Sequence, residues 1–265
     1  MSDFLETVVA ERRADARRAG GLGPRGPAGV PAPSGAARPA FVDAIRAKRA
    51  AGHVAVIAEV KRRSPASGEL ATNGDPAAIA SAYAGAGAAA ISVLTEPRHW
   101  GGSVDDLVAV ARAVDLPILY KDVVVDERQL REAADAGASA VLLIAEALDD
   151  LTLASFVRVS AALGLAALVE AHEHRAFVRA VACGATVVGV NARNLRVPAE
   201  LDRERVDALH GLVRPGQLLV AESGIGTADD LAALPARVDA VLVGTALMTA
   251  ADPGALLRSL AEVRR

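Results

Sequence analysis

Eight short apolar runs, rich in Val, Ile, Leu and Ala, constrain the fold of this chain more than any other feature. They cover residues 54–58, 89–94, 117–119, 140–144, 166–169, 187–190, 218–220 and 240–243. Such runs are typical of strands that are buried on both faces, as in parallel sheets with helical crossovers. Helical spacing of apolar residues appears between them, at residues 76–86, 126–136, 152–163, 173–183 and 228–234. Eight strand-helix units within residues 53–265 predict an α/β protein with a TIM (β/α)8 barrel.

The alternative architecture is a doubly wound open sheet. It is less favoured because no Gly-x-Gly-x-x-Gly motif opens a helix after the first apolar run. We therefore expect one barrel domain over residues 53–265, preceded by an extension over residues 1–52.

The extension has three parts in sequence. Residues 4–18 have the pattern of an amphipathic helix, residues 19–40 form a Gly-, Pro- and Ala-rich linker, and residues 41–51 are a second candidate helix. An extra N-terminal helix can cap a barrel or lie over its mouth, and the sequence pattern allows either position.

Composition excludes several classes of function. A chain of 265 residues with 52% hydrophobic content can bury a full core without disulfides or a metal. A net charge of −3 and 3% aromatic content argue against nucleic-acid binding. No apolar segment has the form of a signal peptide or the length of a membrane span. We expect a cytoplasmic protein that binds neither nucleic acid nor membranes.

Polar side chains stand where the apolar runs end. In a TIM barrel the strand carboxyl ends and the loops that follow them form the active-site face. Acids, lysines and amides at these positions should therefore converge at one end of the barrel. A barrel without a functional site would not need such a group of polar side chains there. The residues concerned are Glu59, Lys61, Lys121, Asp122, Glu170, Asn191, Arg193, Asn194 and Glu222.

Small residues follow the last two runs. Ser223 and Gly224 come after the seventh run, and Gly244 and Thr245 after the eighth, each pair ahead of a predicted helix. Backbone N–H groups and hydroxyls at these two loops are the usual phosphate site of a TIM barrel. We expect a phosphate group to bind there.

The segment His172-Glu173-His174 is the one candidate for a metal site. The two histidines diverge if the segment is helical, and no cysteine or aspartate lies at ligand spacing. We therefore expect solvated surface at the start of the fifth barrel helix, and no metal.

Seven motifs from about residue 40 to the C-terminus follow the order and spacing of one known enzyme family. They are IAEVK at 57–61 with SPxxG at 64–68, ISVLTE at 91–96, GGS at 101–103, LPILxKD at 116–122, LVE at 168–170, GVNARNL at 189–195 and AESGI at 221–225. In these motifs the chain resembles the indole-3-glycerol phosphate synthase family.

The resemblance implies a reaction and a set of roles. The family closes the indole ring of 1-(2-carboxyphenylamino)-1-deoxyribulose 5-phosphate, with loss of carbon dioxide and water, using no cofactor and no metal. It implies that Lys121 is the general acid, that Lys61 anchors the substrate carboxylate, and that Glu59 and Glu170 share the role of base. Asn191 completes the catalytic set. The other implied substrate contacts are Leu94, Trp100, Arg193, Glu222 and Ser223, with Ser64, Ser223, Gly224, Gly244 and Thr245 around the phosphate.

Two positions depart from the family pattern. Val123 stands where the family usually has Phe, after Tyr120-Lys121-Asp122, and Trp100 stands where it usually has Phe before Gly-Gly-Ser. Both positions belong to the family's apolar wall for the anthranilate ring, so the fit of that ring is altered in this chain.

Two other functions remain open from the residues. One is a phosphate-binding barrel enzyme whose Lys121 or Lys61 forms a Schiff base. The other is a catalytically idle protein that keeps the phosphate pocket. The expected partner is a phosphorylated small molecule, and the expected state is a monomer, with a weak homodimer as the alternative.

Overall fold

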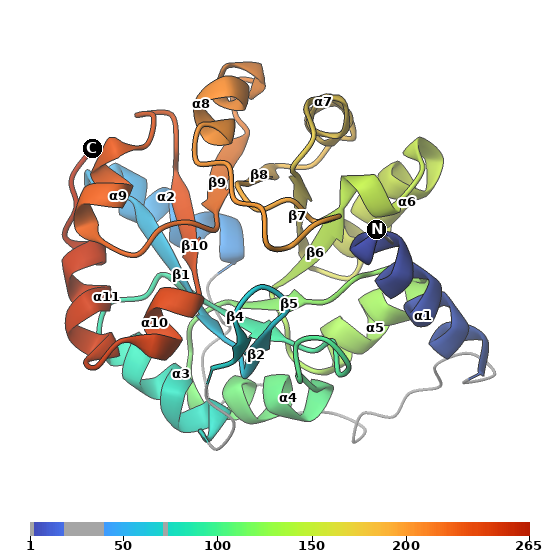
Figure 1. Cartoon of the computed structure of the whole chain (residues 1–265), viewed down its shortest axis with the longest axis horizontal. Coiled ribbons are helices and arrows are strands. Elements are labelled where there is room, and N and C mark those ends of the chain that lie inside the picture. Colours follow the sequence, from blue (N-terminus) through green and yellow to red (C-terminus); the bar gives the residue numbers. More distant parts are fainter. Residues whose placement is uncertain (1–2, 19–39, 71–73) are drawn as a thin grey trace.

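Eight parallel strands close into a barrel within residues 3–18, 40–70 and 74–265, which the computed structural model describes (Figure 1). Around the barrel they follow the order β1-β10-β9-β8-β7-β6-β5-β4. Their bounds are β1 (Ala55–Val60), β4 (Ala90–Leu94), β5 (Ile118–Lys121), β6 (Ala140–Ile144), β7 (Ala166–Ala171), β8 (Val187–Asn191), β9 (Leu218–Glu222) and β10 (Ala240–Val243). The predicted TIM barrel is confirmed.

Helices cover the outside of the barrel. They are α3 (Pro76–Gly85), α4 (Val104–Ala113), α5 (Glu127–Asp135), α6 (Asp150–Ala162), α7 (His174–Ala182), α8 (Arg205–Leu209), α9 (Ala228–Ala233), α10 (Thr245–Thr249) and α11 (Pro253–Ala261), with the 3-10 turns η1 (Ala145–Ala147) and η2 (His210–Leu212). A short antiparallel pair, β2 (Arg63–Ser64) and β3 (Gly68–Glu69), lies in the loop after β1. Helices α4, α8 and α11, the two 3-10 turns and this strand pair are not among the elements that the apolar pattern predicts.

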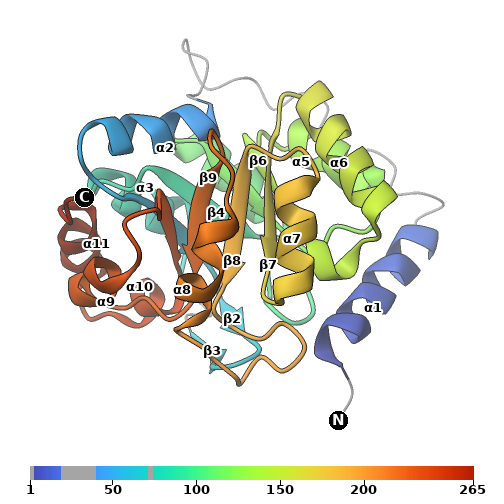
Figure 2. The same ribbon diagram turned by 90° about the horizontal axis from the view of Figure 1, so that it is seen from above.

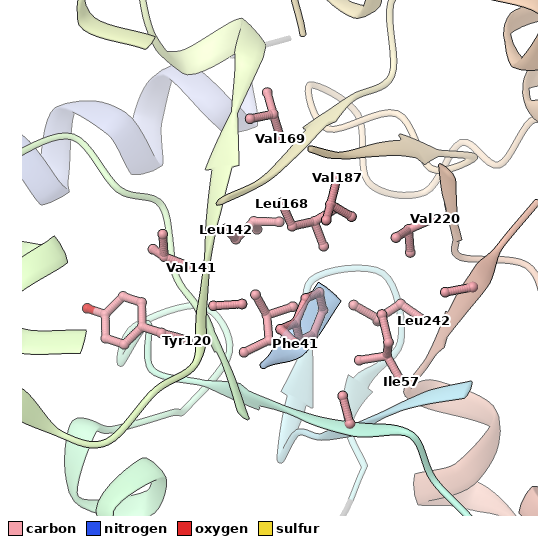
Figure 3. Packing of buried hydrophobic residues seen from close by; sticks show 14 of the residues in the cluster. Phe41, Ile57, Tyr120, Val141, Leu142, Leu168, Val169, Val187, Val220 and Leu242 are labelled. Carbon is pink, nitrogen blue, oxygen red and sulfur yellow. The ribbon is translucent and has the colours of Figure 1, made fainter. Parts of the chain in front are cut away.

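The barrel strands consist mostly of apolar residues, and β1, β7, β8 and β9 carry an acid or an amide near their carboxyl ends. Because helices cover one face and barrel side chains fill the other, nearly every strand residue is buried. Figure 3 shows Ile57, Leu168, Val220 and Leu242 meeting from different strands. The strand register then sets the polar ends beside one another, with Asn191 of β8 opposite Glu222 of β9.

Helix α2 (Phe41–Ala50) covers the amino-terminal end of the barrel. Phe41 and Ile45 are fully buried, and Figure 3 shows Phe41 among the barrel side chains. Arg49 fixes the other end of the helix, since its Nε lies 3.1 Å from Oδ1 of Asp239, just before β10. In Figure 2, α2 and the β2–β3 pair lie at opposite ends of the barrel.

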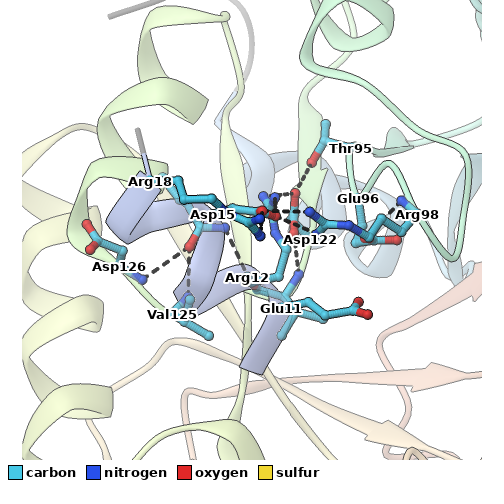
Figure 4. Close-up of polar contacts among 12 residues, drawn as sticks. Glu11, Arg12, Asp15, Arg18, Thr95, Glu96, Arg98, Asp122, Val125 and Asp126 are labelled. Atoms are coloured by element: carbon cyan, nitrogen blue, oxygen red, sulfur yellow. Dashed lines mark hydrogen bonds and ion pairs between the residues drawn. The ribbon is translucent and has the colours of Figure 1, made fainter. Parts of the chain in front are cut away.

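Helix α1 (Phe4–Arg18) lies against the carboxyl-terminal side, near α5 and α6 (Figures 1 and 2). Leu5, Val8 and Val9 join the hydrophobic core. Arg12 reaches in from α1 to Asp122, with Nη2 2.9 Å from Oδ2 (Figure 4). Both helices of the N-terminal extension are thus present, one at each end of the barrel.

The predicted linker lies outside the described residues, except for Ala40. Within the described residues, none of the helices has the length and apolar character that a membrane crossing requires.

Candidate active site

A cavity of about 350 Å³ opens at the carboxyl ends of the barrel strands. Most of the side chains expected to carry the chemistry line it together. Those lining the cavity are Glu59, Lys61, Ser64, Leu94, Trp100, Lys121, Glu170, Asn191, Arg193, Ser223, Gly224, Gly244 and Thr245. Of the residues that the sequence predicts for the catalytic, substrate and phosphate contacts, Glu222 is the exception in the described part of the chain, because it does not line the cavity.

Two lysines and two glutamates form an ion-pair network at one side of the cavity. Lys61 Nζ lies 2.9 Å from Oε1 of Glu59, and Lys121 Nζ lies 3.4 Å from the other oxygen of the same carboxylate. Lys121 also donates a hydrogen bond of 2.9 Å to Oε2 of Glu222. Glu222 therefore lies behind Lys121 and holds its ammonium group, rather than facing the cavity.

Burial and charge set the protonation states in this network. Burial alone would lower the pKa of Lys121, but the carboxylates of Glu222 and Glu59 raise it above its usual range. Burial would raise the pKa of Glu59, but the two ammonium groups hold it below its usual value. The network thus contains a charged Lys121 and an ionised Glu59.

Glu170 differs from Glu59 although both are buried. Burial raises the pKa of Glu170 well above its ordinary value, and the nearby charge of Glu222 raises it further. Its Oε2 atom has no hydrogen-bond partner among the described residues. A carboxylate that contacts no lysine holds a proton more strongly than a carboxylate that contacts two. Glu170 is therefore a better proton acceptor than Glu59.

Two glycines make room for these acids. A Cβ atom on Gly189 would lie 2.5 Å from Oε1 of Glu222 and 3.2 Å from the Cβ of Glu170. A Cβ atom on Gly244 would lie 2.2 Å from Oε1 of Glu59. Only a residue without a side chain fits beside a carboxylate at these distances.

Asn191 connects the network to the small-residue loop after β9. Its Oδ1 accepts hydrogen bonds from Ser223 Oγ at 2.8 Å and from the backbone N–H of Arg193 at 3.0 Å. Ser223 has a φ of 70° and Gly224 a φ of 77°. A non-glycine residue seldom adopts a positive φ, so the bond to Asn191 helps to hold a strained turn at the cavity wall.

The apolar side of the cavity includes residues that sequence reasoning missed. Phe4 and Leu5 of α1 line it together with Trp100 and Val123. The rings of Phe4 and Trp100 meet edge to face, with centroids 5.8 Å apart. No local signal marks Phe4 as a site residue, because its place depends on how α1 docks against the barrel.

The expectation for His172 is wrong. Its exposure is 4%, and Nδ1 lies 3.0 Å from Oε1 of Glu146 in η1. The same Glu146 oxygen accepts the backbone N–H groups of His172 and Glu173. His172 therefore lies in a buried position directly after β7, instead of on the solvated start of α7. Among the described residues, no group of three or more His, Cys, Asp or Glu side chains could hold a metal ion.

Comparisons with known proteins agree on one family. The family model for indole-3-glycerol phosphate synthase matches residues 30–260. The indole-3-glycerol phosphate synthase of Parafrankia sp. (strain EAN1pec) is 52% identical over 212 residues, which are 80% of this chain and 78% of that protein. The protein of the same name from Laribacter hongkongensis (strain HLHK9) is 41% identical over 262 residues, covering 98% of this chain and 99% of its own.

Solved structures with lower identity share the fold. A 3-hexulose-6-phosphate synthase superposes with a TM-score of 0.63 at 19% identity, covering 80% of this chain and all (100%) of the other. Tryptophan synthase from M. tuberculosis, in a ligand-free form, gives a TM-score of 0.64 at 16% identity and covers 85% and 99% of the two chains. At such low sequence identities, these similarities show only that the barrel fold is shared.

The family match over most of the chain, together with a polar cavity at the barrel mouth, places this protein in the indole-3-glycerol phosphate synthase family.

Proposed function

We propose that this protein converts 1-(2-carboxyphenylamino)-1-deoxyribulose 5-phosphate into indole-3-glycerol phosphate, carbon dioxide and water. The observation that carries the proposal is Lys121, a mostly buried ammonium held between Glu59 and Glu222 at the mouth of a barrel of this family. A charged, oriented and desolvated N–H donor is what the first chemical step requires.

Ring closure comes first. The aromatic carbon that carries the carboxylate attacks the ketone carbon of the sugar chain, and the electrons of the C=O bond move to the oxygen. Lys121 donates a proton to that oxygen as the new carbon-carbon bond forms. Its raised pKa keeps the proton in place until substrate arrives.

Decarboxylation then restores the aromatic ring. The bond between the ring carbon and the carboxylate breaks, its electron pair returns to the ring system, and carbon dioxide leaves. Before this step the carboxylate carries a negative charge that needs a cation. Lys61 supplies it, since its ammonium lies in the cavity at the edge of the ion-pair network.

Dehydration completes the indole. A base removes a proton from the methylene carbon next to the nitrogen, a double bond forms, and the hydroxyl group leaves as water with a proton from an acid. Glu170 is the base in our assignment, because its pKa is raised while that of Glu59 is lowered. Lys61 is the acid, and it is free for this role once carbon dioxide has left.

The phosphate binds at the small-residue loops. Ser223 and Gly224 follow β9, Gly244 and Thr245 follow β10, and Ser64 approaches from the loop after β1. Their hydroxyls and backbone N–H groups are the donors that a phosphate accepts. Asn191 and Arg193, between these loops and the glutamates, position the sugar hydroxyls.

The anthranilate ring lies against the apolar wall. This wall consists of Phe4, Leu94, Trp100, Val123, Leu142 and Ile144. Val123 leaves more space than the Phe usual in the family, and Phe4 and the larger Trp100 line the same cavity.

The experiment that tests the proposal is a fluorescence assay of the purified protein with its proposed substrate. Indole formation gives a new emission, and carbon dioxide should be released in a one-to-one ratio with product. If the protein binds the substrate without producing indole, it is an idle phosphate-binding relative. Borohydride trapping with a ketose phosphate distinguishes the other alternative, since only a Schiff-base enzyme would gain a stable adduct on Lys121 or Lys61.

We further propose that the protein acts in the cytoplasm, as a monomer, on a free small-molecule substrate. Light scattering of the purified protein tests the oligomeric state, and cell fractionation tests the location.

A further inference from the structure

Arg203 lies at the rim of the cavity, in the segment between β8 and α8 that crosses the carboxyl end of the barrel (Figure 1). Its side-chain stem packs on the loop after β9, because a Cβ atom on Gly224 would lie 3.7 Å from Arg203 Cγ. The neighbouring Leu201 packs on the same glycine and pairs with Arg193 in an isolated β-bridge. The arginine is thus anchored beside one of the two loops assigned to the phosphate.

The phosphate loops themselves carry no positive charge. Ser64, Ser223, Gly224, Gly244 and Thr245 offer only neutral donors. A bound phosphate monoester has a charge near −2 at neutral pH and three strong acceptor oxygens. A cation in contact with such a group makes charge-assisted hydrogen bonds, which are roughly twice as strong as those from neutral donors.

Four cationic side chains line the cavity in the described part of the chain, and three of them have other tasks. Lys61 and Lys121 are held in the glutamate network. Arg193 donates a 2.6 Å hydrogen bond to the carbonyl oxygen of Pro198 and is assigned to the sugar. The fourth is Arg203.

The present partner of Arg203 is readily exchanged. Its Nη1 lies 2.7 Å from Oδ1 of Asp230, and the arginine side chain is 63% exposed. An exposed ion pair of this kind contributes little free energy because water and salt screen it. Asp230 keeps its other partners without the arginine, since Oδ2 accepts the backbone N–H groups of Gly226 and Thr227.

We propose that Arg203 turns from Asp230 to the substrate phosphate and is the cation of the phosphate site. This inference rests on the proposed function, because it takes the phosphate position from it. Arg203 contacts a part of the substrate that does not react, so it contributes to binding equally in the ground state and the transition state.

The first test compares Arg203→Gln with the unchanged protein. Loss of one charged contact at a partly exposed site should raise KM about tenfold and leave kcat within about twofold. The inhibition constant of inorganic phosphate should rise by a similar factor, and Arg203→Lys should regain part of the affinity. Arg214→Gln is the matched control, because it removes the same charge from an exposed residue ahead of β9, at the other end of the barrel. Equal KM values for Arg203→Gln and Arg214→Gln would overturn the inference.

A second test excludes the possibility that Arg203 only neutralises Asp230. Asp230→Asn removes that charge while its amide oxygen can still accept the two backbone N–H groups. If Arg203 contacts the phosphate, Arg203→Gln still weakens phosphate binding in the Asp230→Asn background. If the effect vanishes there, Arg203 serves Asp230 alone and the inference is wrong.

Calorimetric binding of inorganic phosphate separates this inference from the proposed function. If the protein binds phosphate through Arg203 but forms no indole, the proposed function is wrong and the role of Arg203 in phosphate binding is supported. If the protein forms indole and Arg203→Gln leaves phosphate binding unaffected, the proposed function is supported and the role of Arg203 is wrong.

Discussion

Lys121 donates its shortest hydrogen bond, 2.9 Å long, to Glu222, a residue that lies behind it rather than in the cavity. The other oxygen of Glu222 is buried without a hydrogen-bond partner among the described residues, and it is next to Gly189. Glu222 thus acts on two catalytic groups at once. It orients the ammonium of Lys121, and its charge raises the pKa of Glu170.

The first prediction concerns the pH dependence of the Glu222→Gln variant. If ionised Glu170 is the base, kcat/KM increases with pH as Glu170 loses its proton. Removing the negative charge of Glu222 lowers the pKa of Glu170, so the acidic limb of the profile should move to lower pH even though the maximum rate falls. A limb that stays in place or moves to higher pH would show that another group controls it. Glu170→Gln is the companion variant. Its pH profile of kcat/KM should lack the acidic limb, and most of the activity should be lost.

The second prediction separates binding of the carboxylate from binding of the phosphate. Lys61→Ala removes the cation that we assign to the substrate carboxylate, so KM should increase by about tenfold and kcat should also fall. Product inhibition provides the control, because indole-3-glycerol phosphate has lost the carboxylate. Its inhibition constant should change much less than KM. An equal loss of affinity for substrate and product would place Lys61 elsewhere in the mechanism.

The third prediction tests the space that Gly189 leaves. In Gly189→Ala, the new methyl group collides with Oε1 of Glu222 and crowds Glu170. We expect the free energy of unfolding to decrease by about 1–3 kcal/mol and kcat to fall, as in other overpacked sites. Gly85→Ala is the matched control, since a Cβ atom at Gly85, at the end of α3, meets nothing within 4 Å. Urea unfolding and steady-state kinetics measure both effects, and equal results for the two variants would contradict the account.

The fourth prediction concerns the contribution of α1 to the substrate pocket. Phe4→Ala removes an aromatic ring that lines the cavity and packs on Trp100 and His99. KM should increase several-fold, because about 1–2 kcal/mol of apolar contact is lost, while kcat should change little. Arg13→Ala, at an exposed position of the same helix, should leave KM unchanged. If kcat falls instead of KM rising, Phe4 acts on the chemistry and not on the ring.

The barrel and most of its polar mouth were predictable from sequence for a physical reason. Parallel strands covered on both faces need continuous apolar runs, so a Glu at residue 59 or 170 stands out against its neighbours. The position of such a residue near a strand's carboxyl end also assigns it to the active-site face. Both facts are local and need no knowledge of long-range contacts.

Three features were not predictable in this way. Phe4 reaches the cavity because α1 docks through the buried Arg12–Asp122 pair, a contact between residues 110 positions apart. His172 is buried because Glu146 reaches it from η1, 26 residues earlier. The hydrogen bond from Lys121 to Glu222 forms where Gly189 leaves room for the Glu222 carboxylate, a close approach between neighbouring strands. Each depends on tertiary packing, which apolar periodicity does not encode.

The most direct measurement is the fluorescence assay of indole formation with the unchanged protein and with Lys121→Ala side by side. Because Lys121 donates its proton only as the ring closes, the variant should bind substrate with a similar KM and turn it over with kcat lowered by roughly 10²–10⁴. Circular dichroism and urea unfolding of the variant show whether it is folded. A folded Lys121→Ala protein that forms indole at nearly the unchanged rate would contradict the account.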